Sequence, residues 1–310
     1  MSAREETAVE PGSPTVRVGR RGPAWLRAMR PRQWVKNVLV VAPVIPAGRQ
    51  VGTDTLVGVA VAFALFCLVS SAVYLVNDAK DVEADRAHPR KRFRPIAAGE
   101  LGVVPALVLS GVLGAVALGA GFAWQPMLGV VLAVYAVIQL AYCFGLKHEP
   151  VLELACVASG FLLRMLAGGT AGDIPLSGWF LLTTAFGSLF MAAGKRYGEA
   201  RRGELTGEPV RRVVQKYSTS YLRFVWTLAA TVVVTTYALW AVEVLVEQTG
   251  TNLVLVTLVP FLLAILRYAV DVDRGNAEEP EEIALHDRVL MVLALVWCLS
   301  LVAVVWSGRS

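Results

Sequence analysis

Long apolar stretches recur along the whole chain, and they restrict its fold more than any other feature. Hydrophobic residues make up 56% of the sequence and charged residues only 17%, whereas a soluble globular protein carries about a quarter charged residues. Stretches of roughly 18 or more apolar residues are long enough to cross a bilayer as α-helices, which satisfy their own backbone polar groups. The sequence therefore predicts an all-α polytopic membrane protein.

Nine candidate spans follow one another along the chain. They cover residues 34–49, 55–76, 102–123, 126–143, 150–168, 178–194, 220–242, 252–270 and 287–306. The first is interrupted by Pro43 and Pro46, which disfavour a continuous helix. We expect residues 1–29 to form a disordered basic tail and residues 30–310 to form a single transmembrane domain.

Lys and Arg are unevenly distributed among the connections. Residues 77–101 contain six and residues 195–219 contain seven, whereas 124–125, 169–177 and 243–251 contain none. With nine spans, every basic connection falls on the side of the basic N-terminal tail. The positive-inside rule therefore predicts a cytoplasmic N terminus and a C terminus outside the cell. The net charge of +5 reflects this orientation and anionic ligands, so we expect no nucleic-acid partner.

An acidic cluster, Asn77–Asp85, follows the second span directly. If the helix continues one or two turns past residue 76, Asp78, Asp81 and Asp85 lie on one stripe with Asn77 beside it. Oxygen ligands of this kind suit Mg²⁺, which typically recruits substrate phosphates as well. The alternative is a solvated helix end with ordinary surface acids. We predict that Asn77 and Asp81 coordinate Mg²⁺ and that Asp78 and Asp85 support them.

Basic side chains lie close to this cluster in the sequence. Lys91 and Arg94 follow it, and Lys147 follows the fourth span. Part of this charge follows from topology alone, but Mg²⁺ and cations together also form a clamp for phosphate or diphosphate.

The fifth span contains two ionisable residues, Glu153 and Arg164, eleven residues apart and therefore on one helix face. Ionisable residues inside a span usually face a cavity in the bundle and are functional candidates. Arg164 could bind a ligand, or it could satisfy a backbone carbonyl.

Two residues lie where a lipid headgroup would meet the bundle. Tyr74 is one turn before Asp78, and Lys36 opens the first span. Each could contact a headgroup phosphate, although Tyr at a helix end is often an interfacial anchor and Lys often snorkels.

The Asn-Asp-x-x-Asp-x-x-x-Asp sequence at Asn77–Asp85, followed by Arg94-Pro95-Ile96 and Gly99, resembles the first signature of the UbiA superfamily of intramembrane prenyltransferases. This resemblance implies a nine-helix UbiA-like bundle with an active site built from cytoplasmic loops, and Mg²⁺ as cofactor. Those enzymes carry a second Asp-rich motif after the sixth span. Here the matching segment is Lys195-Arg196-Tyr197-Gly198-Glu199, so the resemblance implies one Mg²⁺-diphosphate site and a second site for an anion.

The chain is similar to a branch of this superfamily, the actinobacterial decaprenyl-phosphate phosphoribosyltransferases. The stretches that carry the similarity are Arg30–Asn37, Lys91–Pro95, Ser159–Arg164, Gly194–Tyr197 and Leu266–Val270. The resemblance implies transfer of a 5-phosphoribosyl group from phosphoribosyl diphosphate (PRPP) to decaprenyl phosphate or a similar polyprenyl phosphate, on the route to cell-wall arabinan. It also implies a location in the bacterial inner (plasma) membrane, in contact with membrane lipid; a homo-oligomer is left open.

This resemblance assigns expected roles to the candidate residues. The PRPP ligands would be Lys91, Arg94, Tyr142, Lys147 and Arg164; the polyprenyl-phosphate ligands would be Lys36, Tyr74, Lys195 and Arg196; and the catalytic residues would be Asp78, Asp85 and Glu199.

Three other interpretations remain at this stage. An ordinary prenyltransferase would join a prenyl diphosphate to an aromatic acceptor. A transporter of phosphorylated lipids would use intramembrane charges along its path, but the spans show no inverted repeat. A structural subunit would leave the acidic cluster unexplained.

Overall fold

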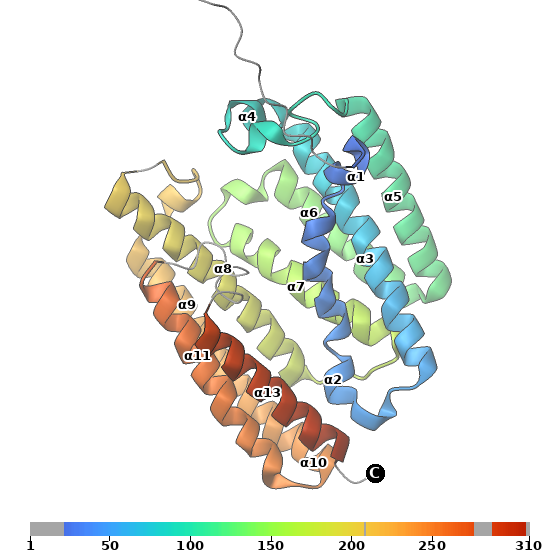
Figure 1. The fold of residues 1–310 in the computed structure, drawn as a ribbon, viewed down its shortest axis with the longest axis vertical. Coiled ribbons are helices and arrows are strands. Elements are labelled where there is room, and N and C mark those ends of the chain that lie inside the picture. Colours follow the sequence, from blue (N-terminus) through green and yellow to red (C-terminus); the bar gives the residue numbers. More distant parts are fainter. Residues whose placement is uncertain (1–21, 208, 276–286, 308–310) are drawn as a thin grey trace, which may run out of the picture.

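The computed structural model of the protein describes residues 22–207, 209–275 and 287–307 (Figure 1). These residues form helices and no strand. Seven helical segments within them are long and apolar enough to cross a membrane: α3 (Thr53–Lys80), α5 (Val103–Trp124), α6 (Pro126–Phe144), α7 (Leu152–Ala171), α9 with the following π-turn (Thr219–Leu245), η7 with α11 (Asn252–Asp273) and α13 (Arg288–Ser307). The predicted all-α membrane class is confirmed.

The other two predicted spans have a different structure from that expected. The span predicted at residues 34–49 is a 3₁₀ segment, η1 (Pro31–Val41), followed by the four-residue helix α2 (Val44–Ala47). Pro43, at the junction, lacks an amide hydrogen and breaks the helix. The span predicted at residues 178–194 is only part of α8 (Gly178–Thr206), whose 29 residues give a length of about 43 Å. Gly, Thr and Ser residues dilute its apolar half.

The bundle has two halves (Figure 1). In the first, α3, α5, α6 and α7 pack around buried side chains such as Phe66, Leu132 and Tyr135. In the second, α8, α9 and α11 pack around Phe190 and Tyr197, and α13 packs along α11. Packing of α7 against α8 joins the halves.

Successive helices run in opposite directions, so the connections gather at two ends of the bundle (Figure 1). One end carries the short helix α4 (Val82–Ala87) and the connections 81–102, 145–151 and 207–218; we call it the basic end, because these connections contain nine Lys and Arg residues. The connections 172–177 and 246–251, at the opposite end near α10 (Val246–Thr249), contain none.

The predicted boundary of the N-terminal tail is too late in the sequence. Residues 1–21 of the predicted tail lie outside the described residues. Residues Ala24–Ala28, however, form the short helix α1, and Ala28 and Met29 are buried against Leu75 and Ile96. The packed part of the chain therefore begins before residue 30.

Gly168 lets η1 approach α7 closely. A Cβ atom at this position would clash with the carbonyl oxygen of Val40. We expect Gly168→Ala to lower the free energy of unfolding by about 1–3 kcal/mol, because η1 must move away from α7. Thermal unfolding in detergent measures the effect, with Gly111→Ala on α5 as control, since a Cβ there meets open space. Equal unfolding temperatures for the two variants would contradict this packing.

Candidate active site

The acidic cluster is divided between two helices. α3 ends at Lys80, and Asp81 adopts φ −90° and ψ 13° before α4 begins at Val82. The expectation of one continuous stripe is therefore wrong. The break separates the carboxylates by environment: Asp78 and Asp85 are buried, whereas Asn77 and Asp81 are partly exposed.

Arginine side chains neutralise the two buried carboxylates. Nη1 of Arg94 donates to Oδ2 of Asp85 at 2.6 Å and to Oδ1 of Asp78 at 3.1 Å. Nη2 of Arg30 donates to the same oxygen of Asp78 at 2.5 Å. Arg30 has a φ of 56°, which few non-glycine residues adopt, and its guanidinium carbon lies 5.2 Å from the centre of the Tyr74 ring. This cluster therefore ties the start of η1, the end of α3 and the connection before α5 together.

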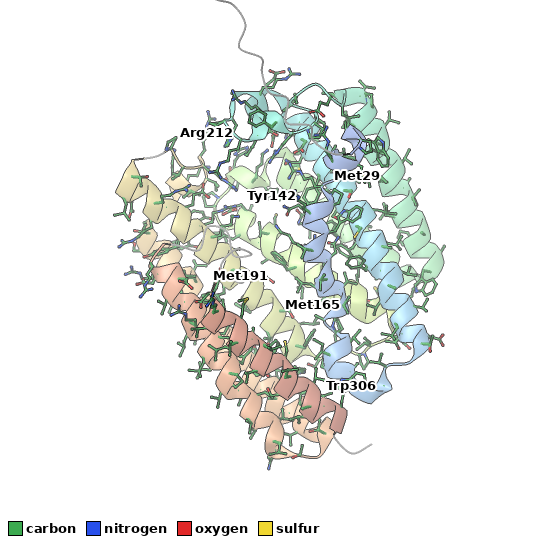
Figure 2. All side chains as sticks on the ribbon, viewed as in Figure 1. Met29, Tyr142, Met165, Met191, Arg212 and Trp306 are labelled. Atoms are coloured by element: carbon green, nitrogen blue, oxygen red, sulfur yellow. The ribbon has the colours of Figure 1, made fainter. Side chains whose placement is uncertain are left out.

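Asn77 and Asp81 instead line a cavity of about 400 Å³ at the basic end. Nζ of Lys147 contacts both carboxylate oxygens of Asp81 at 2.7 Å. Two further predicted residues, Lys91 and Tyr142, also line the cavity. Figure 2 shows Tyr142 at this end of α6. Burial, and then the neighbouring charge of Arg94, lowers the pKa of Lys91 below its usual value. An anion in contact with Lys91 would oppose this shift, because it favours the charged ammonium form.

Arg196 lines the cavity but is held by buried carboxylates. Its Nε and Nη2 donate to Glu153 at 2.8–3.0 Å, and its Nη1 donates to Glu199 at 3.3 Å. Glu153 is fully buried in the first turn of α7, where the helix dipole also favours a negative charge. Oε1 of Glu199 accepts a hydrogen bond from the backbone amide of Arg211 at 3.1 Å. The network therefore joins α7, α8 and the connection 207–218.

Arg164 lies in a different place from the other predicted donor ligands. It donates to the side chain of Asn37 at 2.8 Å, to the carbonyl of Gly160 at 2.6 Å and to the hydroxyl of Tyr135 at 3.3 Å. It does not line the cavity. Its partners favour the structural alternative, in which Arg164 holds η1 against α7. Glu153, expected on the same face, pairs with Arg196 instead.

The remaining predicted acceptor ligands lie outside the cavity lining. Lys36, Tyr74 and Lys195 are partly exposed, and all three make interactions inside the protein. Of the four predicted acceptor residues, only Arg196 reaches the cavity.

The residues present fit a divalent cation completed by substrate oxygens. In the described part of the chain, no three His, Cys, Asp or Glu side chains converge on one point, because Arg30 and Arg94 hold Asp78 and Asp85. An amide oxygen and a carboxylate remain at the cavity, where the ammonium group of Lys147 already occupies the position of a cation beside Asp81. Two protein ligands plus phosphate oxygens are a common environment for Mg²⁺.

Several cavity residues were not predicted from the sequence. His148, Arg211 and Arg212 line the cavity, and Arg30 pairs with Asp78 over 48 residues of sequence. The signal for Arg211 and Arg212 was their charge, which the positive-inside rule also explains. No sequence pattern indicates the contact of Arg30.

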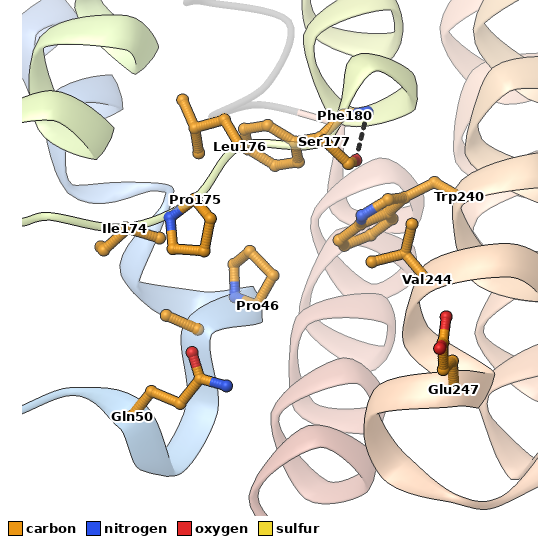
Figure 3. A pocket seen from close by; sticks show the side chains of 11 residues that line it. Pro46, Gln50, Ile174, Pro175, Leu176, Ser177, Phe180, Trp240, Val244 and Glu247 are labelled. Carbon is orange, nitrogen blue, oxygen red and sulfur yellow. Dashed lines mark hydrogen bonds between the residues drawn. The ribbon is translucent and has the colours of Figure 1, made fainter.

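A second cavity of about 390 Å³ lies at the opposite end (Figure 3). Pro46, Pro175 and Trp240 line it, and Ser177 caps α8 at its edge by accepting a hydrogen bond from the Phe180 amide at 3.1 Å. Its described lining contains one acid, Glu247, and no Lys or Arg. It therefore lacks the groups that bind phosphates.

Comparison with known proteins agrees with this fold. Residues 38–296 match the UbiA prenyltransferase family. Decaprenyl-phosphate phosphoribosyltransferase from Mycolicibacterium smegmatis is 53% identical over 283 residues, which is 88% of this chain and 89% of the relative. The protein of the same name from Corynebacterium glutamicum is 51% identical, over 91% of this chain and 86% of the relative.

Solved structures have the same fold at much lower identity. A UbiA homolog from Archaeoglobus fulgidus, bound to DMAPP and Mg²⁺, superposes with a TM-score of 0.68 at 16% identity, over 91% of this chain and 99% of that one. The same homolog bound to GPP and Mg²⁺ gives a TM-score of 0.67 over 92% of this chain and 99% of that one. The family match over residues 38–296 shows that the chain belongs to the UbiA prenyltransferase family.

Proposed function

We propose that this protein transfers the 5-phosphoribosyl group of PRPP to decaprenyl phosphate and releases diphosphate. The observation that carries the proposal is the cavity in which Asn77 and Asp81 face a set of basic side chains. The relatives named as decaprenyl-phosphate phosphoribosyltransferases, at 51–53% identity along most of the chain, support this activity. The cationic segment that stands in place of a second acidic motif supports it too.

The donor site consists of residues that share the cavity. Asn77 and Asp81 would hold Mg²⁺, which when bound neutralises charge on the leaving diphosphate. Lys91, Arg94 and Lys147 bind the phosphate oxygens, and Tyr142 lies beside them. Asp78 and Asp85 act by holding Arg94 in position. Arg164 lies outside the cavity lining and is not assigned to the donor site.

The reaction needs little beyond electrostatic stabilisation. An oxygen of the lipid phosphate forms a bond to C1 of the ribose, while the bond from C1 to the diphosphate breaks and its electron pair leaves with the diphosphate. The nucleophile is already anionic near neutral pH, with a charge of about −1.5 to −2, so no strong general base is required. The cations of the site stabilise the charge that develops on the leaving group.

The acceptor phosphate approaches from the membrane side of the cavity. Lys36, Tyr74 and Lys195 remain the proposed contacts for the lipid, because they lie on η1, α3 and α8 near the basic end. Arg196 and Glu199 instead form the wall behind the cavity, since both are engaged with each other and with neighbouring elements.

We infer that the seven apolar segments, α8 and the η1–α2 segment all cross the bacterial plasma membrane, with the basic end in the cytoplasm. The alternation of the segments and the distribution of Lys and Arg support this orientation. PRPP then reaches the cavity from the cytoplasm, and the lipid reaches it from the membrane. The product would serve as a precursor of cell-wall arabinan.

Labelled PRPP tests this function directly. Purified protein with Mg²⁺ and decaprenyl phosphate should move the ribose label into the lipid phase and release one diphosphate per transfer. Decaprenol, which lacks the phosphate, should not be an acceptor. Label that stays in the aqueous phase would contradict the proposal, and movement of lipid without release of diphosphate would indicate a transporter.

Lys147→Ala is expected to weaken PRPP binding at least tenfold. Loss of a cation from a desolvated phosphate contact costs about 2–5 kcal/mol, and about 1.4 kcal/mol corresponds to a factor of ten. Equilibrium titration with PRPP and Mg²⁺ measures the change. Arg92→Ala is the matched control. Arg92 is also positively charged and lies in the connection 81–102 at the same end of the bundle, but it does not line the cavity. An unchanged titration for Lys147→Ala would show that this lysine does not bind PRPP, and its charge would then be explained by membrane topology alone.

A further inference from the structure

The connection 207–218 forms one wall of the cavity. Arg211, Arg212 and Val213 line it together with Asn77, in the last turn of α3, and Asp81, which follows that helix. Figure 2 shows Arg212 at the basic end, toward α8. The predicted donor ligands all come from the first half of the bundle, whereas this wall and Arg196 of α8 come from the second half.

The wall is fixed in position from both sides. On the side of α8, Glu199 accepts from the Arg211 amide at 3.1 Å and lies 3.5 Å from its Nε. On the other side, the Tyr217 hydroxyl accepts from the Val151 amide at 2.6 Å, and Nζ of Lys216 donates to the His148 carbonyl at 2.8 Å.

Burial fixes the middle of the same connection. Val213 and Val214 are 4% and 1% exposed and pack in the core of the second half. The side chains that precede them are therefore presented to the cavity by a held backbone.

Some basic side chains of the cavity lining have a carboxylate partner and others do not. Asp81 is the only carboxylate among the described lining residues. Arg94, Lys147, Arg196 and Arg211 each have a carboxylate within ion-pair distance. For Lys91 and Arg212, the described residues provide no such partner. Lys91 follows the acidic cluster, and Arg212 comes from the other half of the bundle.

A phosphoribosyl donor carries phosphate at two places, the diphosphate on C1 and the monoester on C5. A prenyl diphosphate carries only the first. The acidic cluster with Lys91 and Lys147 provides for the diphosphate, which leaves the monoester to be recognised by another cation. The planar guanidinium of Arg binds phosphate oxygens in a bidentate manner.

We propose that Arg212 binds the 5-phosphate of the sugar donor, and that Glu199 positions it through Arg211. The inference rests on the proposed function and deepens it, because it names the residue that recognises the 5-phosphate. That group is present in PRPP and absent from a prenyl diphosphate. Glu199 is then a positioning residue that does not touch the substrate.

Two donor analogues test the assignment with purified full-length protein and Mg²⁺. PRPP carries the 5-phosphate, and α-ribose 1-diphosphate lacks it. Arg212→Ala should weaken PRPP binding by about tenfold or more and leave the binding of ribose 1-diphosphate nearly unchanged. Lys147→Ala should weaken both. Arg92→Ala, an exposed cation outside the lining, should alter neither.

Glu199→Gln should reproduce part of the selective loss, and Glu199→Asp should restore some of it. Equal weakening of both analogues by Arg212→Ala, or no weakening, would overturn the assignment. A change confined to the KM for decaprenyl phosphate would move Arg212 to the acceptor. Failure of the wild-type protein to bind PRPP would instead overturn the proposed function itself.

Discussion

Asp81→Asn is expected to lower turnover by about 10²-fold or more, the scale seen when a group that stabilises transition-state charge is removed. Asp81 is the only carboxylate in the described lining of the cavity, and it holds both the metal and Lys147 in our account. The substitution keeps the side-chain shape but removes the charge that holds both. Its partly exposed ion pair with Lys147 is worth only about 0–1 kcal/mol, so the variant should remain folded.

Release of diphosphate by the detergent-solubilised variant measures this loss. Glu83→Gln is the control, because Glu83 belongs to the same acidic segment but is 81% exposed and has Arg86 as its ion-pair partner among the described residues. Near-normal turnover of Asp81→Asn would sink the assignment of Asp81, as would wild-type activity that persists in excess EDTA.

Glu153→Ala is expected to lower the free energy of unfolding by about 3–5 kcal/mol, because it leaves the guanidinium of Arg196 buried with a weaker partner. Glu153 is fully buried and accepts three hydrogen bonds from Arg196. Thermal or chemical unfolding in detergent measures the change. The exposed pair gives the matched control, since Glu83→Ala should cost about 0–1 kcal/mol.

The double variant Glu153→Leu with Arg196→Met distinguishes the cost of an unpaired buried charge from the cost of lost side-chain packing. Replacement of a buried ion pair by apolar residues of similar size is often neutral, so the double variant should be more stable than Glu153→Ala. If Glu153→Ala and Glu83→Ala unfold at the same temperature or denaturant concentration, the buried network does not join α7 and α8 as described.

The sequence predicts well the apolar helices that bury little of their surface inside the bundle. α5 and α13 are apolar on nearly every side, so composition alone identifies them. It predicts two other segments poorly. Proline interrupts residues 31–47 and leaves a 3₁₀ segment. In α8, Gly, Ser and Thr lower the apolar content of a helix that is largely buried inside the bundle.

The candidate site follows a similar division. Asn77, Asp81, Lys91 and Arg94 lie within 18 residues of one another, and the sequence places them together as a motif. The partners of Arg196 and Arg164 depend on how distant helices pack. Glu153 and Arg164 share a helix in sequence, yet each pairs with a residue of another element. Periodicity gives the face of a residue but not the partner that tertiary packing supplies.

Donor competition tests the central claim most directly. Purified protein with Mg²⁺ is given PRPP and geranyl diphosphate together, with decaprenyl phosphate and 4-hydroxybenzoate as acceptors. Our account predicts that ribose 5-phosphate is transferred to the lipid phosphate, that geranyl diphosphate is not consumed, and that the aromatic acid is recovered unchanged. Prenylation of the aromatic acid, with PRPP left intact, would contradict it.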